Sequence, residues 1–103
     1  MKPNELEKII NEAFENKQSV SENSDKKILD AIKETIELTD KGNIRVADKK
    51  NGKWSVNQWV KKAILLSFRV NKMTMSKGPY TTWYDKVPGK SVLWNENDWK
   101  KAG

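Results

Sequence analysis

Two stretches near the N-terminus repeat apolar residues at the spacing of an amphipathic helix. In residues 5–16 the apolar positions follow i, i+3, i+4, i+7 and i+8, and they are Leu6, Ile9, Ile10, Ala13 and Phe14. In the next stretch Ser24 is a typical N-cap and Lys41-Gly42 a typical helix end. The apolar stripe between them is Ile28, Leu29, Ile32 and Ile36. We therefore predict a helical hairpin over residues 1–42, joined by a polar linker.

The two apolar stripes can cover each other only in part. Phe14, Ala31 and Leu38 lie off the strict seam between two paired helices. Apolar side chains in such positions need further surface to pack against, because burial is what makes an amphipathic helix stable. We expect another element of the chain to pack there.

From Ile44 the hydrophobic period changes to two, which is typical of β-strands. Asn51-Gly52 is a favoured pair for a tight turn, so residues 44–56 predict a β-hairpin. Asn57 is then the predicted N-cap of a third helix from Gln58 to about Val70. Its predicted broad buried face is Trp59, Val60, Ala63, Ile64, Leu66, Ser67 and Val70, and its rim carries Lys61, Lys62 and Arg69.

The remaining residues predict less regular structure. Residues 71–82 are polar around Gly78-Pro79, and Val87-Pro88-Gly89 marks a turn. A short last helix is predicted from Asn95 as N-cap to Lys101, with acids in its first turn and lysines in its last. The predicted fold class is α+β and mainly α, with a helical hairpin at 1–42 and a β-hairpin plus helices at 43–103.

Composition excludes several classes of function. The chain has no His and no Cys, so it offers no imidazole base, no thiolate nucleophile and no disulfide. No apolar run is longer than Ala63 to Leu66, which is too short for a membrane span or a signal peptide. We expect a cytoplasmic protein that makes no contact with membranes.

Charge is distributed unevenly along the chain. Residues 1–40 hold six lysines and ten acids, a net charge of −4, whereas residues 41–103 have a net charge of +10. The basic half attracts anions, and nucleic acid, coenzyme A or a dicarboxylate would all fit. Nucleic acid is the least favoured, because no recognition motif accompanies the lysines at the hairpin tip, Lys49, Lys50 and Lys53.

The five tryptophans, all beyond residue 50, could form a stacking platform for bases. Packing in a core or an interface is favoured instead, since Trp54, Trp59 and Trp99 all lie on apolar faces of predicted elements. Trp83 and Trp94 remain as candidates for exposed aromatic residues.

No complete active site or metal site is visible in the sequence. The acids Asp25, Asp30, Asp85 and Glu96 fall in helix starts and turns, where capping is their expected role. Ser67 has no candidate base nearby. The one charge we single out is Arg69, because a guanidinium just before an irregular segment could bind a substrate carboxylate with two hydrogen bonds. A simple helix C-terminal cation is the alternative, and it is the commoner role for an arginine in this position.

Three segments carry a resemblance to a known family. The long run from Ile44 to Asn71, the segment Tyr84-Asp85-Lys86-Val87-Pro88 and the first helix from Leu6 to Phe14 resemble tetrahydrodipicolinate N-succinyltransferase, in order along nearly the whole chain. The resemblance implies transfer of a succinyl group from succinyl-CoA to ring-opened tetrahydrodipicolinate in lysine and diaminopimelate synthesis. It also implies a homotrimer.

In that family a left-handed parallel β-helix follows the helical N-terminal domain and carries the acidic catalytic residues and the coenzyme A cleft. We expect residues 1–103 to correspond to the N-terminal domain alone, to lack the β-helix and to be inactive by themselves. A free-standing basic module that binds nucleic acid or a protein is the alternative.

Overall fold

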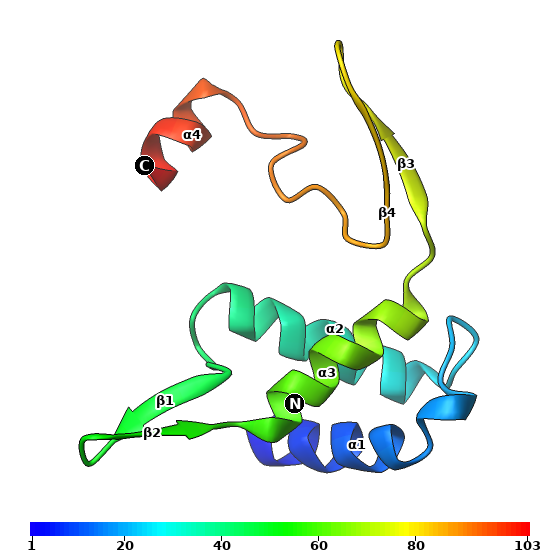
Figure 1. The fold of residues 1–103 in the computed structure, drawn as a ribbon, viewed down its shortest axis with the longest axis vertical. Helices are drawn as coiled ribbons and strands as arrows, with labels where there is room; N and C mark the ends of the chain where they lie inside the picture. Colours follow the sequence, from blue (N-terminus) through cyan, green and yellow to red (C-terminus); the bar gives the residue numbers. More distant parts are fainter. The chain divides into compact units, whose positions relative to one another are not determined.

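The structure, a computed structural model, describes all of residues 1–103 and divides them into two units, Met1–Lys72 and Met73–Gly103 (Figure 1). The fold is α+β and mainly helical, as predicted, and contains no β-helix. The first unit contains α1 (Pro3–Glu15), the 3-10 turn η1 (Lys17–Ser19), α2 (Lys26–Asp40), β1 (Ala47–Lys50), β2 (Lys53–Val56) and α3 (Gln58–Val70). The second contains β3 (Thr74–Lys77), β4 (Thr82–Asp85) and α4 (Glu96–Ala102).

Helix α2 begins later than the sequence indicates. Its N-cap is Asp25, and the predicted cap Ser24 instead accepts a hydrogen bond at its Oγ from the N–H of Ser21, at 2.8 Å. The hydroxyl is therefore used to close the turn that precedes the helix. At the other end the predicted stop at Lys41-Gly42 is confirmed, and Gly42 has φ +80°.

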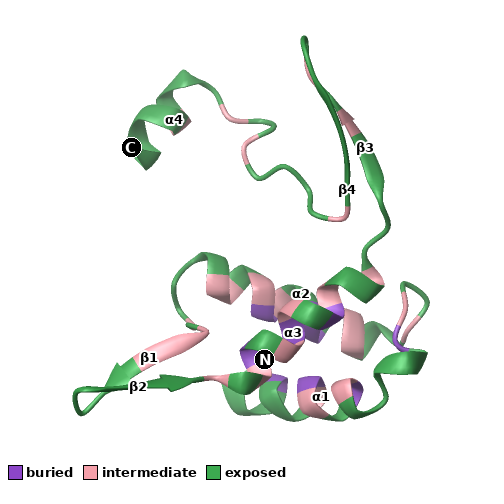
Figure 2. Cartoon of the chain, in the orientation of Figure 1, coloured by how far each residue is buried: buried purple, intermediate pink, exposed green.

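A single core joins α1, α2 and α3, and it occupies the first unit (Figure 2). Its buried residues are Leu6, Ile10, Ala13, Val20, Ala31, Ile32, Val60, Ala63 and Leu66. Helix α3 supplies the additional surface that the two-helix hairpin was expected to need. Because α2 packs against two helices, its buried residues are Ala31, Ile32 and Thr35, and the predicted stripe residues Ile28, Leu29 and Ile36 are only half-buried.

The β1–β2 hairpin is confirmed, with Ala47 paired to Val56 and Lys50 to Lys53. Asn51 and Gly52 have φ of 52° and 79°, as a primed hairpin turn requires. The first strand begins at Ala47 and not at Ile44. Its predicted start is wrong because the N–H of Ile44 donates to the carbonyl of Leu38 and so belongs to the end of α2.

Helix α3 has the predicted bounds, but the side chain of Asn57 makes no capping hydrogen bond. Its amide donates instead to the carbonyl of Arg45 at 2.6 Å and to Oδ2 of Asp48 at 2.8 Å. The side chain thus connects the start of α3 to the first strand of the hairpin.

The second unit contains a hairpin that the sequence did not reveal. Strands β3 and β4 pair Met75 with Tyr84 and Ser76 with Trp83, in a region expected to be irregular. Gly78 and Thr81 close its turn through a 2.7 Å backbone hydrogen bond. Helix α4 is confirmed, and it begins with a capping box between Asn95 and Asp98.

No residue of Met73–Gly103 is buried. Across the whole chain, no helix combines the length and apolar content needed to cross a membrane.

Candidate functional site

The exposed side of α3 combines apolar and cationic side chains. We define the α3 outer face as Lys61, Leu65, Phe68 and Arg69, which helical periodicity places together opposite the buried Ala63. Leu65 is 46% exposed and Phe68 is 44% exposed, large fractions for apolar residues in the middle of a helix. The face therefore offers an apolar centre between two positive charges.

Arg69, the residue singled out in the sequence, lies in the last turn of α3 and is exposed. It forms no ion pair with any carboxylate of this chain. An exposed guanidinium keeps its hydrogen-bond donors available for an external carboxylate. No other titratable side chain accompanies it on the outer face except Lys61.

Lys62, the third cation expected on the rim of α3, has a structural role. It is half-buried, and its Nζ donates to Oδ1 of Asn11 at 3.2 Å. The same Nζ lies 5.4 Å from the ring centroid of Phe14, and Lys17 covers this ring at 4.8 Å. Lys62 therefore fastens α3 to α1 through a hydrogen bond and a cation–π contact.

The tip of the β1–β2 hairpin is basic and carries an exposed aromatic ring. Lys49, Lys50 and Lys53 form no ion pair in the chain, and Trp54 lies directly opposite Lys49 in the hairpin register. Trp54 is 70% exposed, so it does not pack in the core of this chain, and packing in an interface stays a prediction.

The other tryptophans agree with the sequence interpretation in part. Trp83 is exposed as expected and Trp59 packs against the core, whereas Trp99 is 56% exposed, so only packing in an interface remains for it as a prediction. Trp94 is half-buried rather than exposed. Its ring meets that of Trp99 edge to face, with 5.1 Å between centroids.

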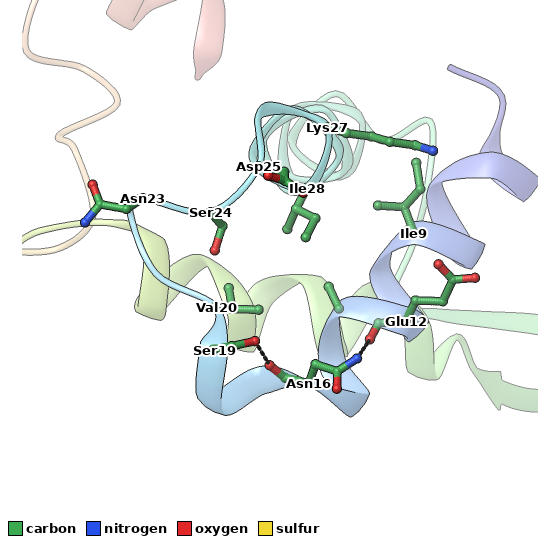
Figure 3. Close-up of a pocket in the computed structure, with 11 residues that line it drawn as sticks. Ile9, Glu12, Asn16, Ser19, Val20, Asn23, Ser24, Asp25, Lys27 and Ile28 are labelled. Atoms are coloured by element: carbon green, nitrogen blue, oxygen red, sulfur yellow. Dashed lines mark hydrogen bonds between the residues drawn. The ribbon is translucent and has the colours of Figure 1, made fainter.

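A groove lies between the end of α1, η1 and the start of α2 (Figure 3). Its volume is about 550 Å³, within the range of pockets that bind small molecules or side chains. The apolar residues that line it are Ile9, Ala13, Val20 and Ile28, and the charged ones are Glu12, Asp25 and Lys27. Asn16 and Ser19 use their side chains for local hydrogen bonds to backbone carbonyls, of Glu12 and Asn16 respectively.

A smaller groove of about 350 Å³ shares Ile9, Glu12 and Lys27 with the larger one and adds the acid Glu5. The sequence interpretation missed both grooves, and it missed the larger one because the residues from Asn16 to about Asn23 were interpreted as a polar linker. The only signal there was Val20, which is 5% exposed and closes the groove floor.

The carboxylates considered for catalysis make local contacts instead. Asp25 is the N-cap residue of α2, and Oδ1 of Asp85 accepts hydrogen bonds from the N–H groups of Lys86 and Val87. Glu96 pairs with Lys100 at 3.3 Å. No three acidic side chains gather into a group that could hold a metal ion. The turn bonds of Asp85 agree with the role expected from the sequence, whereas the side chain of Asp25 makes no capping hydrogen bond.

The family model and the curated relatives that match this chain describe the same family. Residues 5–70 match the family described as Tetrahydrodipicolinate N-succinyltransferase N-terminal. Curated relatives named 2,3,4,5-tetrahydropyridine-2,6-dicarboxylate N-succinyltransferase include one from Pelagibacter ubique (strain HTCC1062), which is 57% identical over 102 residues. That alignment covers 96% of this chain and 37% of the relative.

Two further relatives carry the same name. The protein of Bartonella henselae is 46% identical over 101 residues, covering 95% of this chain and 36% of the relative. The protein of Thioalkalivibrio sulfidiphilus (strain HL-EbGR7) is 44% identical over 99 residues, again covering 95% of this chain and 36% of the relative. The chain thus spans little more than a third of the length of the curated relatives it matches.

Proposed function

Because the chain belongs to the family of tetrahydrodipicolinate N-succinyltransferase N-terminal domains, we propose that residues 1–103 form the N-terminal domain of an enzyme that succinylates tetrahydrodipicolinate. Both the helical hairpin at 1–42 and the remainder at 43–103 belong to this domain. The observation that carries the proposal is the 57% identity to a relative of that name over 96% of the chain. The enzyme would act in lysine and diaminopimelate biosynthesis.

The reaction we propose joins an amine to a thioester. The amino nitrogen of the ring-opened substrate attacks the carbonyl carbon of succinyl-CoA, an amide bond forms, the nitrogen loses a proton, and coenzyme A leaves as the thiol. Such a reaction needs a base for the proton and donors for the developing oxyanion. Residues 1–103 contain no imidazole, Asp85 accepts hydrogen bonds in a turn, and Glu96 pairs with Lys100. We therefore assign catalysis to other parts of the enzyme.

The role we propose for this domain is to attract and orient anionic substrates. Residues 41–103 have a net charge of +10, and both succinyl-CoA and the dicarboxylate are anions. Arg69 is the proposed contact to a substrate carboxylate, because its guanidinium is exposed and unpaired. We further propose that the complete enzyme is a cytoplasmic homotrimer.

The test compares the isolated residues 1–103 with the complete protein that contains them. Release of the coenzyme A thiol from succinyl-CoA, in the presence of the dicarboxylate substrate or an aminopimelate analogue, is expected only for the complete protein. Turnover by residues 1–103 alone would contradict the assignment of catalysis, and a complete protein without turnover would contradict the function.

The role of Arg69 is tested in the same assay. An Arg69→Ala change in the complete protein is expected to raise KM for the dicarboxylate by about tenfold or more, because charge-assisted hydrogen bonds are lost. Lys33→Ala removes an exposed charge from α2 and is the matched control. An unchanged KM for Arg69→Ala in a folded protein would rule out the contact.

A further inference from the structure

We propose that Lys61, Leu65 and Phe68 of the α3 outer face of one copy of the chain dock into the α1–α2 groove of a second copy, which leaves Arg69, in the last turn of the helix, for the substrate. The α1–α2 groove is the one in Figure 3, lined by Ile9, Val20 and Ile28 among others. The proposal names a contact between chains, so it goes beyond the succinyl transfer proposed above.

The α3 outer face has the composition of a helix that binds a groove. Leu65 and Phe68 are three residues apart, 46% and 44% exposed, and lie on one side of the helix. Amphipathic helices bind grooves through apolar anchors at this kind of spacing. Lys61 lies on the same side of the helix, and helix α3 contains no acid, so this face carries positive charge.

The groove is complementary to this face in its apolar surface and in its charge. Its floor is apolar, and its volume of about 550 Å³ accommodates side chains such as leucine and phenylalanine. Glu12 and Asp25 lie on its rim, with Lys27 as the only cation. One wall is α1, which carries four glutamates and a single lysine and therefore has a net charge of −3. An apolar, acid-walled groove favours a helix whose apolar anchors have a cation beside them, which here is Lys61.

The two surfaces cannot meet within one chain. Helix α3 turns Val60, Ala63 and Leu66 into the core beneath α1 and α2, so its outer face is directed away from both helices. No residue of α3 lines the groove. The contact therefore has to form between copies.

A contact between two different surfaces of the same chain is heterologous. Copies then join head to tail, and the assembly closes into a ring if the rotation between neighbours allows it. A homotrimer is one such closed ring. The closure into a ring is the only part of the inference that rests on the proposed function.

Cysteine cross-linking tests the contact directly, because the chain has no cysteine of its own. A Leu65→Cys chain, with its cysteine on the outer face, is mixed with an Asn23→Cys chain, whose cysteine lines the groove at an exposed position. Under mild oxidation the mixed dimer is expected to form about tenfold faster than with Lys33→Cys in place of Asn23→Cys, because docking raises the effective concentration of the two thiols. Lys33 is an exposed residue of α2 outside the groove.

A second variant removes the anchor next to the cross-link. Adding Phe68→Ser to the Leu65→Cys chain is expected to slow formation of the mixed dimer about fivefold or more, because an apolar contact is lost. Phe68 is exposed, so the helical signal in circular dichroism should persist and confirm that the fold is intact.

Equal rates of mixed-dimer formation with Asn23→Cys and Lys33→Cys would overturn the proposal. A rate that stays the same when Phe68→Ser is added would overturn it too. The outcomes also separate the two proposals. A trimeric, active enzyme without the cross-link would contradict the docking contact alone, whereas a specific cross-link in a complete protein that transfers no succinyl group would contradict the function alone.

Discussion

The side-chain amide of Asn57 lies 2.8 Å from Oδ2 of Asp48, so the residue that precedes α3 is bonded to the first strand of the β1–β2 hairpin. The same amide donates to the carbonyl of Arg45, and the backbone N–H of Asn57 donates to the carbonyl of Val46. These bonds fix the point at which the hairpin joins the helical core.

Replacing Asn57 with alanine is therefore expected to weaken this joint. Asn57→Ala removes two side-chain hydrogen bonds, one of them to a charged group, and should lower the free energy of unfolding by about 1–3 kcal/mol. Urea denaturation followed by circular dichroism measures the change. Asn4→Ala, at an exposed position in the first turn of α1, is the control and should change the midpoint little. Equal midpoints for the two variants would show that the Asn57 bonds do not stabilise the fold.

The hairpin turn gives a second prediction, with a local effect. Gly52 has φ +79°, a conformation that costs alanine about 1 kcal/mol, so Gly52→Ala should destabilise the turn. Every residue of β2 is exposed, so the core should be unaffected. Hydrogen exchange is expected to accelerate for the amides of β1 and β2 and to stay constant in α3. Lys53→Ala is the matched control, and equally fast exchange in both variants would contradict the strain argument.

The sequence predicted the elements whose signals are local. Helices α1 and α3 have apolar residues at regular helical spacing, and Asn51-Gly52 permits the positive φ values that a tight hairpin needs. These features depend on neighbouring residues and not on distant contacts, so the sequence alone was enough to locate them.

The elements that the sequence did not reveal depend on tertiary contacts or have weak patterns. The buried face of α2 is set by its contacts with both α1 and α3, which is why Thr35 lies in the core. The β3–β4 hairpin has strands of four residues with no buried position, so no alternation of buried and exposed residues marks it. The α1–α2 groove forms where the buried Val20 meets the end of α1 and the start of α2, so it depends on packing between segments.

The N-terminal amine provides a prediction about pH. The amine of Met1 donates a hydrogen bond to Oε1 of Glu34 at 2.9 Å, and this bond and the carboxylate charge raise the pKa of the amine above its usual value of 8.0. A raised pKa means that the interaction stabilises the fold fully below pH 8 and is lost as the pH rises through the higher value.

Glu34→Gln should therefore return the pKa of the Met1 amine toward 8.0, because the carboxylate charge is removed. The rate at which the amine reacts with an acylating reagent, measured against pH, reports this pKa. Glu37→Gln changes the same helix at an exposed position one turn away and should leave the profile as in the unaltered chain. Identical profiles for all three proteins would mean that the pair with Glu34 does not persist in solution.

Thr35 is the one buried polar residue of the core, and its hydroxyl donates to the carbonyl of Ala31 at 2.7 Å. That carbonyl is also the acceptor of the helical hydrogen bond from the Thr35 N–H, so it keeps a partner without the hydroxyl. Thr35→Val preserves the shape of the side chain and should change the free energy of unfolding by less than about 1 kcal/mol. Thr35→Ala removes buried atoms, leaves a cavity and should cost about 1–2 kcal/mol. Thr39→Val, at a half-buried position with the same kind of hydroxyl bond, serves as the control. If valine at position 35 destabilises the protein more than alanine does, the hydroxyl bond and not packing is what the core requires there.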